Sequence, residues 1–434
     1  MHVRPRLVVA VAVAGLVAAL VPIEPLVAGI VAVGLLAALV AADVVLAPPA
    51  GALRVSRSAP EVLRLGHRAD IVVAMHAPTA RPLAVDLHDA TPPSMRRTPV
   101  RHHVTIEPGG RVRLAARVVP ARRGRATFGP ITIRTAGPLG LAGRQGRIPL
   151  LQETKVYPAL HGRAEMEARL KRARLLQSGV RSSALRGGGS EFDALREYRP
   201  DDEFRRINWR ATARSPHPIA NEYREEQNQQ VLLLLDASRA AAGQVQGVSR
   251  LEHALDAAIT VGELAVRVGD QVGAIAFDRG VQASVEARGG RAQTRRILDL
   301  LFDLEPRLDA ADYAGAFAAM LRRHRRRSWV VLFTDLSEPS VLEPLVRAIP
   351  VLLTRHLLVV ASVRDPEVEA HAALRPTSSE EAYAKAAAAG FLAWRDRSAA
   401  TISRMGAHCL DRPPGALAAA VADEYLRVKA LGRL

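Results

Sequence analysis

The stretch QVLLLLDAS, residues 230–238, has the pattern of a fully buried β-strand that ends in a polar tip. Residues 249–269 follow it with apolar side chains at helical spacing, and Leu251, Leu255 and Ile259 share one face of that helix. A buried strand followed by an amphipathic helix is the unit from which parallel sheets are built. The stretch therefore predicts an α/β domain.

The same alternation continues to the end of the chain. Strands are expected in QVGAIAFD (271–278), VQASVEA (281–287), SWVVLFTDLSEP (328–339), HLLVVAS (356–362) and AHCLD (407–411), and helices near 290–304, 311–326, 340–348, 380–404 and 414–430. Strands that alternate with helices predict a doubly wound, mostly parallel sheet with helices on both faces. We expect this domain to span residues 228–434.

Two of these strands end in an acid at the edge where ligands bind in such sheets. Asp236 and Asp335 are the two acids, and Ser238 adds a hydroxyl. These oxygens suit a hard cation such as Mg²⁺, which takes few protein ligands and keeps several waters. The other interpretation is that Asp236 and Ser238 only cap the helix that follows.

This region resembles a von Willebrand factor A domain. The metal site of that family carries D-x-S-x-S after the first strand, a Thr in a later loop and an Asp after the fourth strand. Here DASRA keeps Asp236 and Ser238 but has Ala240 at the second Ser, and Asp335 matches the last Asp. The loop LDAADYAGAF (308–317) offers acids rather than a clear Thr. The resemblance implies a metal site of which this sequence retains only part.

Residues 191–214 carry a longer ordered motif, E-F-x-x-L-R-x-Y-x-x-x-D-x-x-R-x-I-N-W-x-x-T-A-R. It resembles the signature of the bacterial "domain of unknown function" family 58. Asp201 stands where the family usually has Gly, which puts the local turn in doubt. The matching residues are Glu191, Phe192, Leu195, Arg196, Tyr198, Asp202, Arg205, Ile207, Asn208, Trp209, Thr212, Ala213 and Arg214.

The resemblance extends to the organisation of the chain: a membrane hairpin, a β-rich segment and an A-type domain. It implies a membrane-tethered adaptor rather than an enzyme. It further implies a MoxR-type AAA+ ATPase as partner in protein assembly or maturation, and often a membrane transglutaminase-like protein beside it.

The chemistry of the motif itself allows two roles. It contains no Ser–His or Cys–His pair, and arginine stays charged and cannot act as a base. Arg205 and Arg206 either neutralise neighbouring acids within the fold or hold a partner's carboxylates, and Trp209 offers a large apolar anchor. The motif is expected either to clamp the fold or to present a partner-binding surface. The candidate residues are Glu191, Arg196, Tyr198, Asp202, Arg205, Arg206, Asn208, Trp209, Thr212 and Arg214.

Two other classes of function stay open as alternatives. One is a metal-dependent hydrolase that uses the strand-end carboxylates, although no general base stands near them in the sequence. The other is a lipid- or nucleic-acid-binding protein driven by its net charge of +17. Only four of the 60 basic residues are lysines, which codon usage explains better than function does, and the RRHRRR run at 322–327 has the position of a solvated helix end. Nucleic acid is therefore not expected as a partner.

The first fifty residues contain two apolar runs, 7–21 and 26–42, separated by the sequence PIEP. Each is near the length that crosses a bilayer as a helix, and Pro cannot continue a helix across the break. Arginines flank both outer ends, and the turn carries only Glu24. This predicts a two-helix membrane hairpin over 1–47 with both ends in the cytoplasm. A cleaved signal peptide is the competing interpretation.

Short alternating runs with Gly or Pro every ten residues or so follow, and they predict a β-sandwich over 51–157. Residues 158–227 are expected to be a connector that holds the motif. The lone Cys409 is expected to be a packed thiol.

Overall fold

The computed structural model describes residues 2–20, 24–97, 101–158, 191–200, 202–224, 229–337 and 339–431. The chain divides into two compact units, Met1–Ala159 and Leu160–Leu434, and each is described here by itself. Residues 159–190 of the expected connector lie outside the described residues. The chain is thus a multidomain protein that combines apolar N-terminal helices with several β-sheets.

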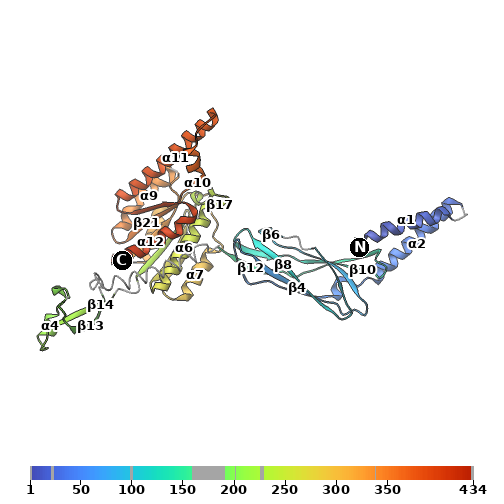
Figure 1. The fold of residues 1–434 in the computed structure, drawn as a ribbon, viewed down its shortest axis with the longest axis horizontal. Helices are drawn as coiled ribbons and strands as arrows, with labels where there is room; N and C mark the ends of the chain where they lie inside the picture. Colours follow the sequence, from blue (N-terminus) through green and yellow to red (C-terminus); the bar gives the residue numbers. More distant parts are fainter. Residues whose placement is uncertain are drawn as a thin grey trace. The chain divides into compact units, whose positions relative to one another are not determined.

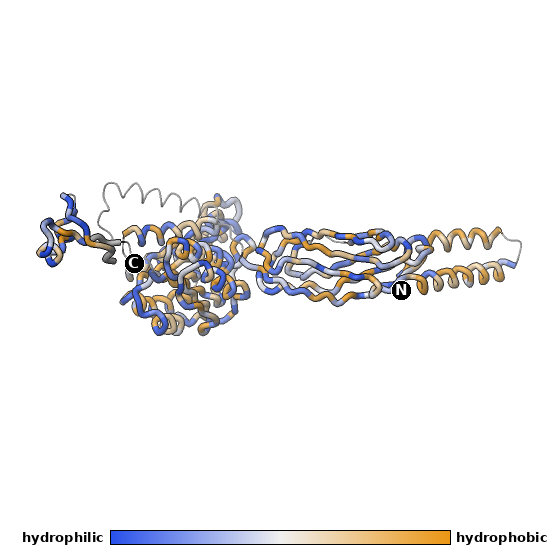
Figure 2. Tube along the Cα trace, turned by 90° about the horizontal axis from the view of Figure 1, so that it is seen from below, coloured by the Kyte–Doolittle hydropathy of each residue, from blue (hydrophilic) through white to orange (hydrophobic). Residues whose placement is uncertain are grey.

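Two apolar helices begin the first unit. Helix α1 spans Pro5–Leu20 and helix α2 spans Pro25–Leu46, and they lie side by side (Figures 1 and 2). The 22 residues of α2 give a length of about 33 Å, enough for a hydrocarbon core of about 30 Å. Among the described residues, α2 lies in the one helical segment long and apolar enough to cross a membrane.

The rest of the first unit consists of short, mostly antiparallel strands. Five strands form one sheet in the order β1-β11-β10-β5-β7, four form a second in the order β2-β4-β8-β6, and three form a small sheet β3-β12-β9. The two larger sheets share an apolar core, in which Val73 and Met75 of one meet Val85, Leu87 and Ile133 of the other. The strands are β1 His2–Val3, β2 Arg54–Ser58, β3 Val62–Arg64, β4 Ala69–His76, β5 Leu83–Asp89, β6 Met95–Arg97, β7 Arg101–Ile106, β8 Arg111–Pro120, β9 Gly124–Phe128, β10 Ile131–Ala136, β11 Ala142–Ile148 and β12 Gln152–Tyr157.

Strand β5 shows why alternation was informative here. Its residues alternate between buried and partly exposed along its whole length, as expected for a strand with one face on a core. The sequence did not indicate the buried ion pair between Arg57 and Asp89, whose side chains are 1% and 2% exposed. Arg57 also donates to the backbone oxygens of Leu150 and Gly129, so both terminal nitrogens of its guanidinium group are hydrogen-bonded inside the unit.

The helices are tied to this β structure at both outer ends. Strand β1, just before α1, pairs with β11. Near the end of α2, the Asp43 carboxylate accepts hydrogen bonds from the backbone N–H groups of Leu139, Leu141 and Ala142 at 2.7, 2.7 and 2.8 Å. The helix pair therefore leaves and rejoins the β structure at one place, the β10–β11 corner.

The α/β domain of the second unit is built on a six-stranded sheet with the order β19-β18-β15-β20-β21-β22. Strand β15 (Gln230–Asp236) lies inside it, parallel to β18 and β20, and all but its first residue is buried. Only the edge strand β19 runs antiparallel. The other strands are β18 Gln271–Phe277, β19 Val281–Arg288, β20 Ser328–Phe333, β21 Leu357–Val363 and β22 His408–Arg412.

Helices cover both faces of this sheet (Figure 1). Val231, Leu233 and Leu235 of β15 pack in a core with α6, α7 and α12, whereas Leu232 and Leu234 pack in a second core with α8 and α9. Two cores on opposite faces explain why β15 is apolar without interruption. The helices are α5 Arg239–Ala242, α6 Arg250–Val268, α7 Arg291–Leu301, α8 Tyr313–Arg323, α9 Pro339–Leu353, α10 Pro366–Ala373, α11 Ser379–Arg404 and α12 Pro414–Ala430.

Two helices differ from the sequence-based expectation. Helix α9 continues to Leu353 through Pro344 and Pro350, because the burial of Leu345 and Ile349 outweighs the lost backbone hydrogen bonds. Helix α10 was not expected at all. Its signal was present in Asp365, which accepts a hydrogen bond from the third residue of the turn, followed by Pro at the first helical position.

Candidate functional site

The motif of residues 191–214 folds into a small lobe on two antiparallel strands, not into a plain connector. Strand β13 (Glu191–Glu197) pairs with β14 (Ile219–Arg224), with an irregularity between Phe192 and Ala194. Between the strands lie the short 3-10 helix η2 (Phe204–Arg206) and the single-turn helix α4 (Trp209–Thr212). Figure 1 shows β13, α4 and β14 grouped together in this lobe.

An ion pair holds the turn of this lobe. Arg196 donates two parallel hydrogen bonds to the Asp202 carboxylate, at 2.7 and 2.6 Å, and the backbone N–H of Arg199 donates a third at 2.9 Å. The Tyr198 hydroxyl donates to the backbone oxygen of Asp202 at 3.0 Å. The hydrogen bonds from Arg196 hold the pKa of Asp202 below its ordinary value despite burial. These motif residues stabilise the lobe itself.

Asn208 and Thr212 join α4 to β14. The Asn208 side chain donates to Asn221 at 2.9 Å and accepts from the backbone N–H of Ala211 at 3.0 Å, which caps α4. The Thr212 hydroxyl accepts from the backbone N–H of Ile219 at 2.9 Å. The conformation of the motif after Asp202 is therefore determined by side-chain to backbone bonds.

The remaining charges of the motif behave less uniformly. Arg205 and Arg206 both pair with Glu203, the second at 3.8 Å, which agrees with mutual neutralisation within the fold. Arg214 is exposed. Glu191 lies in β13, and the structure describes its backbone alone.

Two aromatic rings of the lobe face outward. Phe204 and Trp209 are 69% and 61% exposed, and their rings meet edge to face with centroids 5.5 Å apart. The partner of Trp209 in the lobe is therefore the ring of Phe204. An exposed aromatic pair on an internally satisfied lobe is available for contact with another surface.

The strand-end acids lie at one edge of the α/β sheet, as the sequence predicted, because β15 and β20 are parallel neighbours. The Asp236 carboxylate accepts hydrogen bonds from the Tyr313 hydroxyl at 2.8 Å, the Thr334 hydroxyl at 2.6 Å and the backbone N–H of Ser238 at 2.9 Å. Burial raises the pKa of Tyr313, so its hydroxyl stays a donor. Asp236 is 1% exposed and surrounded by donors.

Asp335 is surrounded by donors too, and two of them are charged arginines. Its Oδ1 accepts from Arg395 at 2.7 Å and Arg250 at 3.1 Å, and its Oδ2 accepts from Ser337. Ser238 begins helix α5 without a capping bond from its hydroxyl. Within the described ranges, no three His, Cys, Asp or Glu side chains are grouped so as to hold a metal ion. The three residues predicted as metal ligands do not fit a divalent cation in this arrangement.

The acids of the 308–317 loop serve other purposes. Asp312 accepts from the backbone N–H of Gly315 at 2.8 Å and caps α8. The backbone oxygen of Asp309 accepts from the N–H of Arg239 at 2.9 Å, and its carboxylate lies 3.9 Å from Arg279. These bonds join Asp309 and Asp312 to other groups than Asp236.

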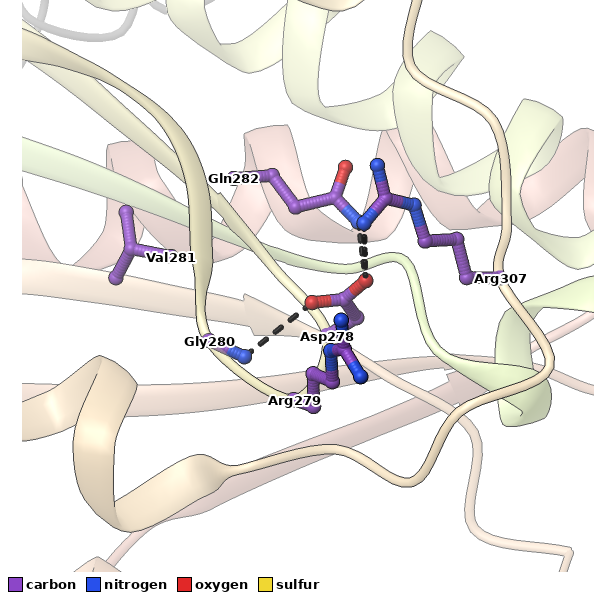
Figure 3. Close-up of a pocket in the computed structure, with 6 residues that line it drawn as sticks. All are labelled: Asp278, Arg279, Gly280, Val281, Gln282 and Arg307. Carbon is purple, nitrogen blue, oxygen red and sulfur yellow. Dashed lines mark hydrogen bonds and ion pairs between the residues drawn. The ribbon is translucent and has the colours of Figure 1, made fainter.

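An open cavity of about 510 Å³ lies at the end of β18, lined by Asp278, Arg279, Gly280, Val281, Gln282 and Arg307 (Figure 3). Asp278 is 2% exposed and accepts from Gln282 and from the backbone N–H of Gly280. Arg307 approaches it to 3.5 Å. The cavity is therefore lined by two arginine side chains beside an acid that already accepts hydrogen bonds from within the chain.

Sequence reasoning missed several residues of this edge. Asp278 follows a buried strand in the same way as Asp236 and could have been found by that rule. Asp411, at the end of the predicted strand 407–411, could have been found in the same way. Arg250 and Arg395 carried no such signal, because they reach Asp335 only when α6 and α11 pack against the sheet.

Comparisons with known proteins identify part of the chain. Residues 194–374 match the family described as "Protein of unknown function DUF58". The match runs from the lobe through α10 and ends before α11. The sequence-based resemblance to this family is supported for that segment.

Uncharacterized proteins of Mycobacterium bovis and Mycobacterium tuberculosis are each 30% identical to this chain over 184 residues, which is 42% of this chain and 56% of the relative. The chain thus spans little more than half the length of the curated relatives it matches.

Solved structures give weaker likenesses. The CARDB domain of a Pyrococcus furiosus protein, in complex with di-metal ions, is 11% identical and covers 26% of this chain and 91% of its own, with a TM-score of 0.20. Salmonella alpha-2-macroglobulin reacted with methylamine is 17% identical and covers 24% of this chain and 7% of its own, also with a TM-score of 0.20. At these TM-scores neither likeness carries functional information.

Proposed function

We propose that this chain is a membrane-anchored adaptor of the DUF58 type, which holds partner proteins at the cytoplasmic face of a membrane. We propose a MoxR-type AAA+ ATPase as the principal partner, with a membrane transglutaminase-like protein as a second. The proposed role is in protein assembly or maturation, without a reaction of its own.

The membrane anchor is proposed to be a hairpin of α1 and α2. Both outer ends of the pair attach to the β structure, through β1 and through Asp43, so the two helices point the same way from it. Helix α1, at 16 residues or about 24 Å, is short for a full bilayer. A bilayer can accommodate this shorter helix by becoming thinner around the helix pair, or residues of the turn can complete the span. Arginines at both outer ends favour a cytoplasmic position for the rest of the chain.

The α/β domain is proposed to be von Willebrand factor A-like. Its doubly wound strand order and the placement of Asp236 and Asp335 at one edge support the assignment.

One observation carries the adaptor role: the exposed Phe204–Trp209 pair on the signature lobe. The charged and polar residues of the same motif satisfy one another, so they explain the lobe's shape but leave its aromatic pair without a structural use inside the lobe. Exposed Trp flanked by Arg is typical of the residues that dominate binding energy at interfaces. We therefore propose that the motif binds a partner through this aromatic pair.

The test is a pull-down of the tagged full-length chain from membranes in ATP and in ADP. We expect recovery of an AAA+ ATPase by the wild type, and a loss of at least about 30-fold in affinity for Phe204→Ala combined with Trp209→Ala, since hot-spot residues contribute about 2 kcal/mol or more. Tyr383→Ala is the matched control, because Tyr383 is an aromatic side chain that is 79% exposed and does not belong to the motif.

Two outcomes would contradict the proposal. If the wild type recovers no ATPase in either nucleotide, the adaptor role fails. If the double variant instead unfolds at lower urea concentration than the control variant, the rings dock on another part of this chain, and the motif is a structural clamp.

A further inference from the structure

Arg395 of α11 is a buried cation at the carboxyl edge of the α/β sheet. Its side chain is 1% exposed. It donates to Asp335 at 2.7 Å, to Asp411 at 2.6 and 3.2 Å, and to the Ser362 hydroxyl at 2.8 Å. A fifth bond, at 3.0 Å, goes to the backbone oxygen of Val363. One guanidinium therefore joins the ends of the three strands β20, β21 and β22.

A second arginine reaches the same acid from the opposite face of the sheet edge. Arg250, the first residue of α6, donates to Asp335 at 3.1 Å and to the backbone oxygen of Val363 at 2.6 Å. Its side chain is 12% exposed. Oδ1 of Asp335 thus accepts hydrogen bonds from two guanidinium groups.

The charges of this buried group balance without a metal. Asp335 and Asp411 carry two negative charges, and Arg250 and Arg395 carry two positive ones. Arg364 stands 3.8 Å from Asp411 but is engaged with acids nearer the solvent. Burial alone would lower the pKa of Arg395, but its bonds to the two acids outweigh burial and raise it.

A divalent ion at this edge would need free oxygen lone pairs, since Mg²⁺ is held by oxygens at about 2.0–2.1 Å. The Asp335 and Asp236 oxygens accept N–H and O–H groups instead. Ala240, at the position of the missing second Ser of the A-domain motif, is buried and supplies no oxygen ligand through its side chain. The sequence and the structure therefore both indicate that the metal site of the A-domain family is not retained here.

We propose that Arg250 and Arg395 take the place of the divalent cation at this sheet edge. Asp335 and Asp411 are neutralised by charges that the chain itself supplies, Asp236 is held by neutral donors, and the edge binds no Mg²⁺ or Mn²⁺. Partners that meet this face do so without a metal-coordinated carboxylate.

The test uses the full-length chain in lipid nanodiscs, with Mg²⁺ and Mn²⁺ as probes in calorimetric titration and in thermal unfolding against EDTA. The wild type should give no binding heat and the same Tm in EDTA and in either metal. Arg395→Ser should behave differently. It removes from Asp335, Asp411 and Ser362 the bonds that Arg395 makes and vacates one buried cation position between them, so Mn²⁺ should raise its Tm and EDTA should reverse the rise.

Two further variants keep the test decisive. Arg397→Ser removes an exposed arginine of the same helix and should match the wild type. Arg395→Lys retains the charge and should stay insensitive to metal even if Arg395→Ser does not fold. Binding of Mg²⁺ or Mn²⁺ by the wild type that Asp236→Ala abolishes would overturn the proposal, and so would an Arg395→Ser protein that folds and ignores Mn²⁺.

Discussion

Replacement of Asp43 by Ala should loosen the junction between α2 and the β structure. Asp43 is fully buried, and its carboxylate accepts three backbone N–H groups. A hydrogen bond to a charged group contributes about 1.5–3 kcal/mol, so three bonds set an upper range of roughly 4.5–9 kcal/mol. The N–H groups of Leu139 and Leu141 are only partly buried and regain water. We therefore expect the local opening free energy to fall by about 3–5 kcal/mol.

The assay is amide hydrogen exchange of the full-length chain in nanodiscs, followed by mass spectrometry of peptides that cover residues 137–143. A fall of 3 kcal/mol corresponds to exchange that is faster by roughly 100-fold or more. Asp43→Asn should be less damaging than Asp43→Ala, because its amide oxygen can still accept from Leu141 and Ala142, which share Oδ2, whereas its NH₂ group cannot accept from Leu139.

Asp70→Ala is the matched control. Asp70 lies in the same unit, is 65% exposed and pairs with Arg117 at 3.4 Å, and an exposed ion pair contributes at most about 1 kcal/mol. Unchanged exchange at residues 137–143 in Asp43→Ala, or full protection in Asp43→Asn, would refute the role assigned to this carboxylate.

Three further outcomes are expected. The bonds from Arg196 lower the pKa of Asp202. The stabilisation of the lobe by these bonds is therefore complete above pH 3.8, the ordinary pKa, and is lost as the pH falls through the lowered pKa of Asp202. An NMR titration of the carboxyl group should give a higher pKa for Asp202 in Arg196→Ala than in the wild type. An unchanged pKa would contradict the ion pair. Burial raises the pKa of Cys409 to about 12, so a disulfide reagent at about pH 8 should find roughly one thiolate in 10⁴ and label the thiol quickly only after unfolding in urea; fast labelling of the native chain would show an accessible thiol. Tyr313→Phe removes the hydroxyl that donates a hydrogen bond to the buried Asp236 carboxylate and should lower the unfolding free energy, measured by urea titration, by about 1–3 kcal/mol. Tyr383→Phe, at a 79% exposed position, should leave the unfolding free energy unchanged in the same titration.

The order of elements could be read from the sequence wherever burial follows a simple period. The six strands of the α/β sheet were all expected, because each fits a short apolar or alternating run. Helix α10 was missed because its eight residues have no buried face to create a pattern. Its capping residues were the only local signal.

The site was less accessible to the same reasoning. Asp236 and Asp335 were placed at one edge correctly, since parallel neighbours end at the same side of a sheet. Their chemistry was not, because the groups that surround them come from distant parts of the chain. Arg395 is 60 residues beyond Asp335, and a helix position that faces a sheet edge looks like any other buried position in a one-dimensional pattern.

The sequence by itself determined the apolar N-terminal helices, the β-rich segment, the α/β domain and the signature motif. These are local properties, since propensity and hydrophobic period act over a few residues to a few turns. Only the tertiary structure decided which charges meet. It placed the guanidinium groups of Arg250 and Arg395, which lie 85 and 60 residues away in the chain, on Asp335, and it left Phe204 and Trp209 exposed. Ion pairs and exposure depend on distances between segments far apart in the chain, and those distances exist only after packing.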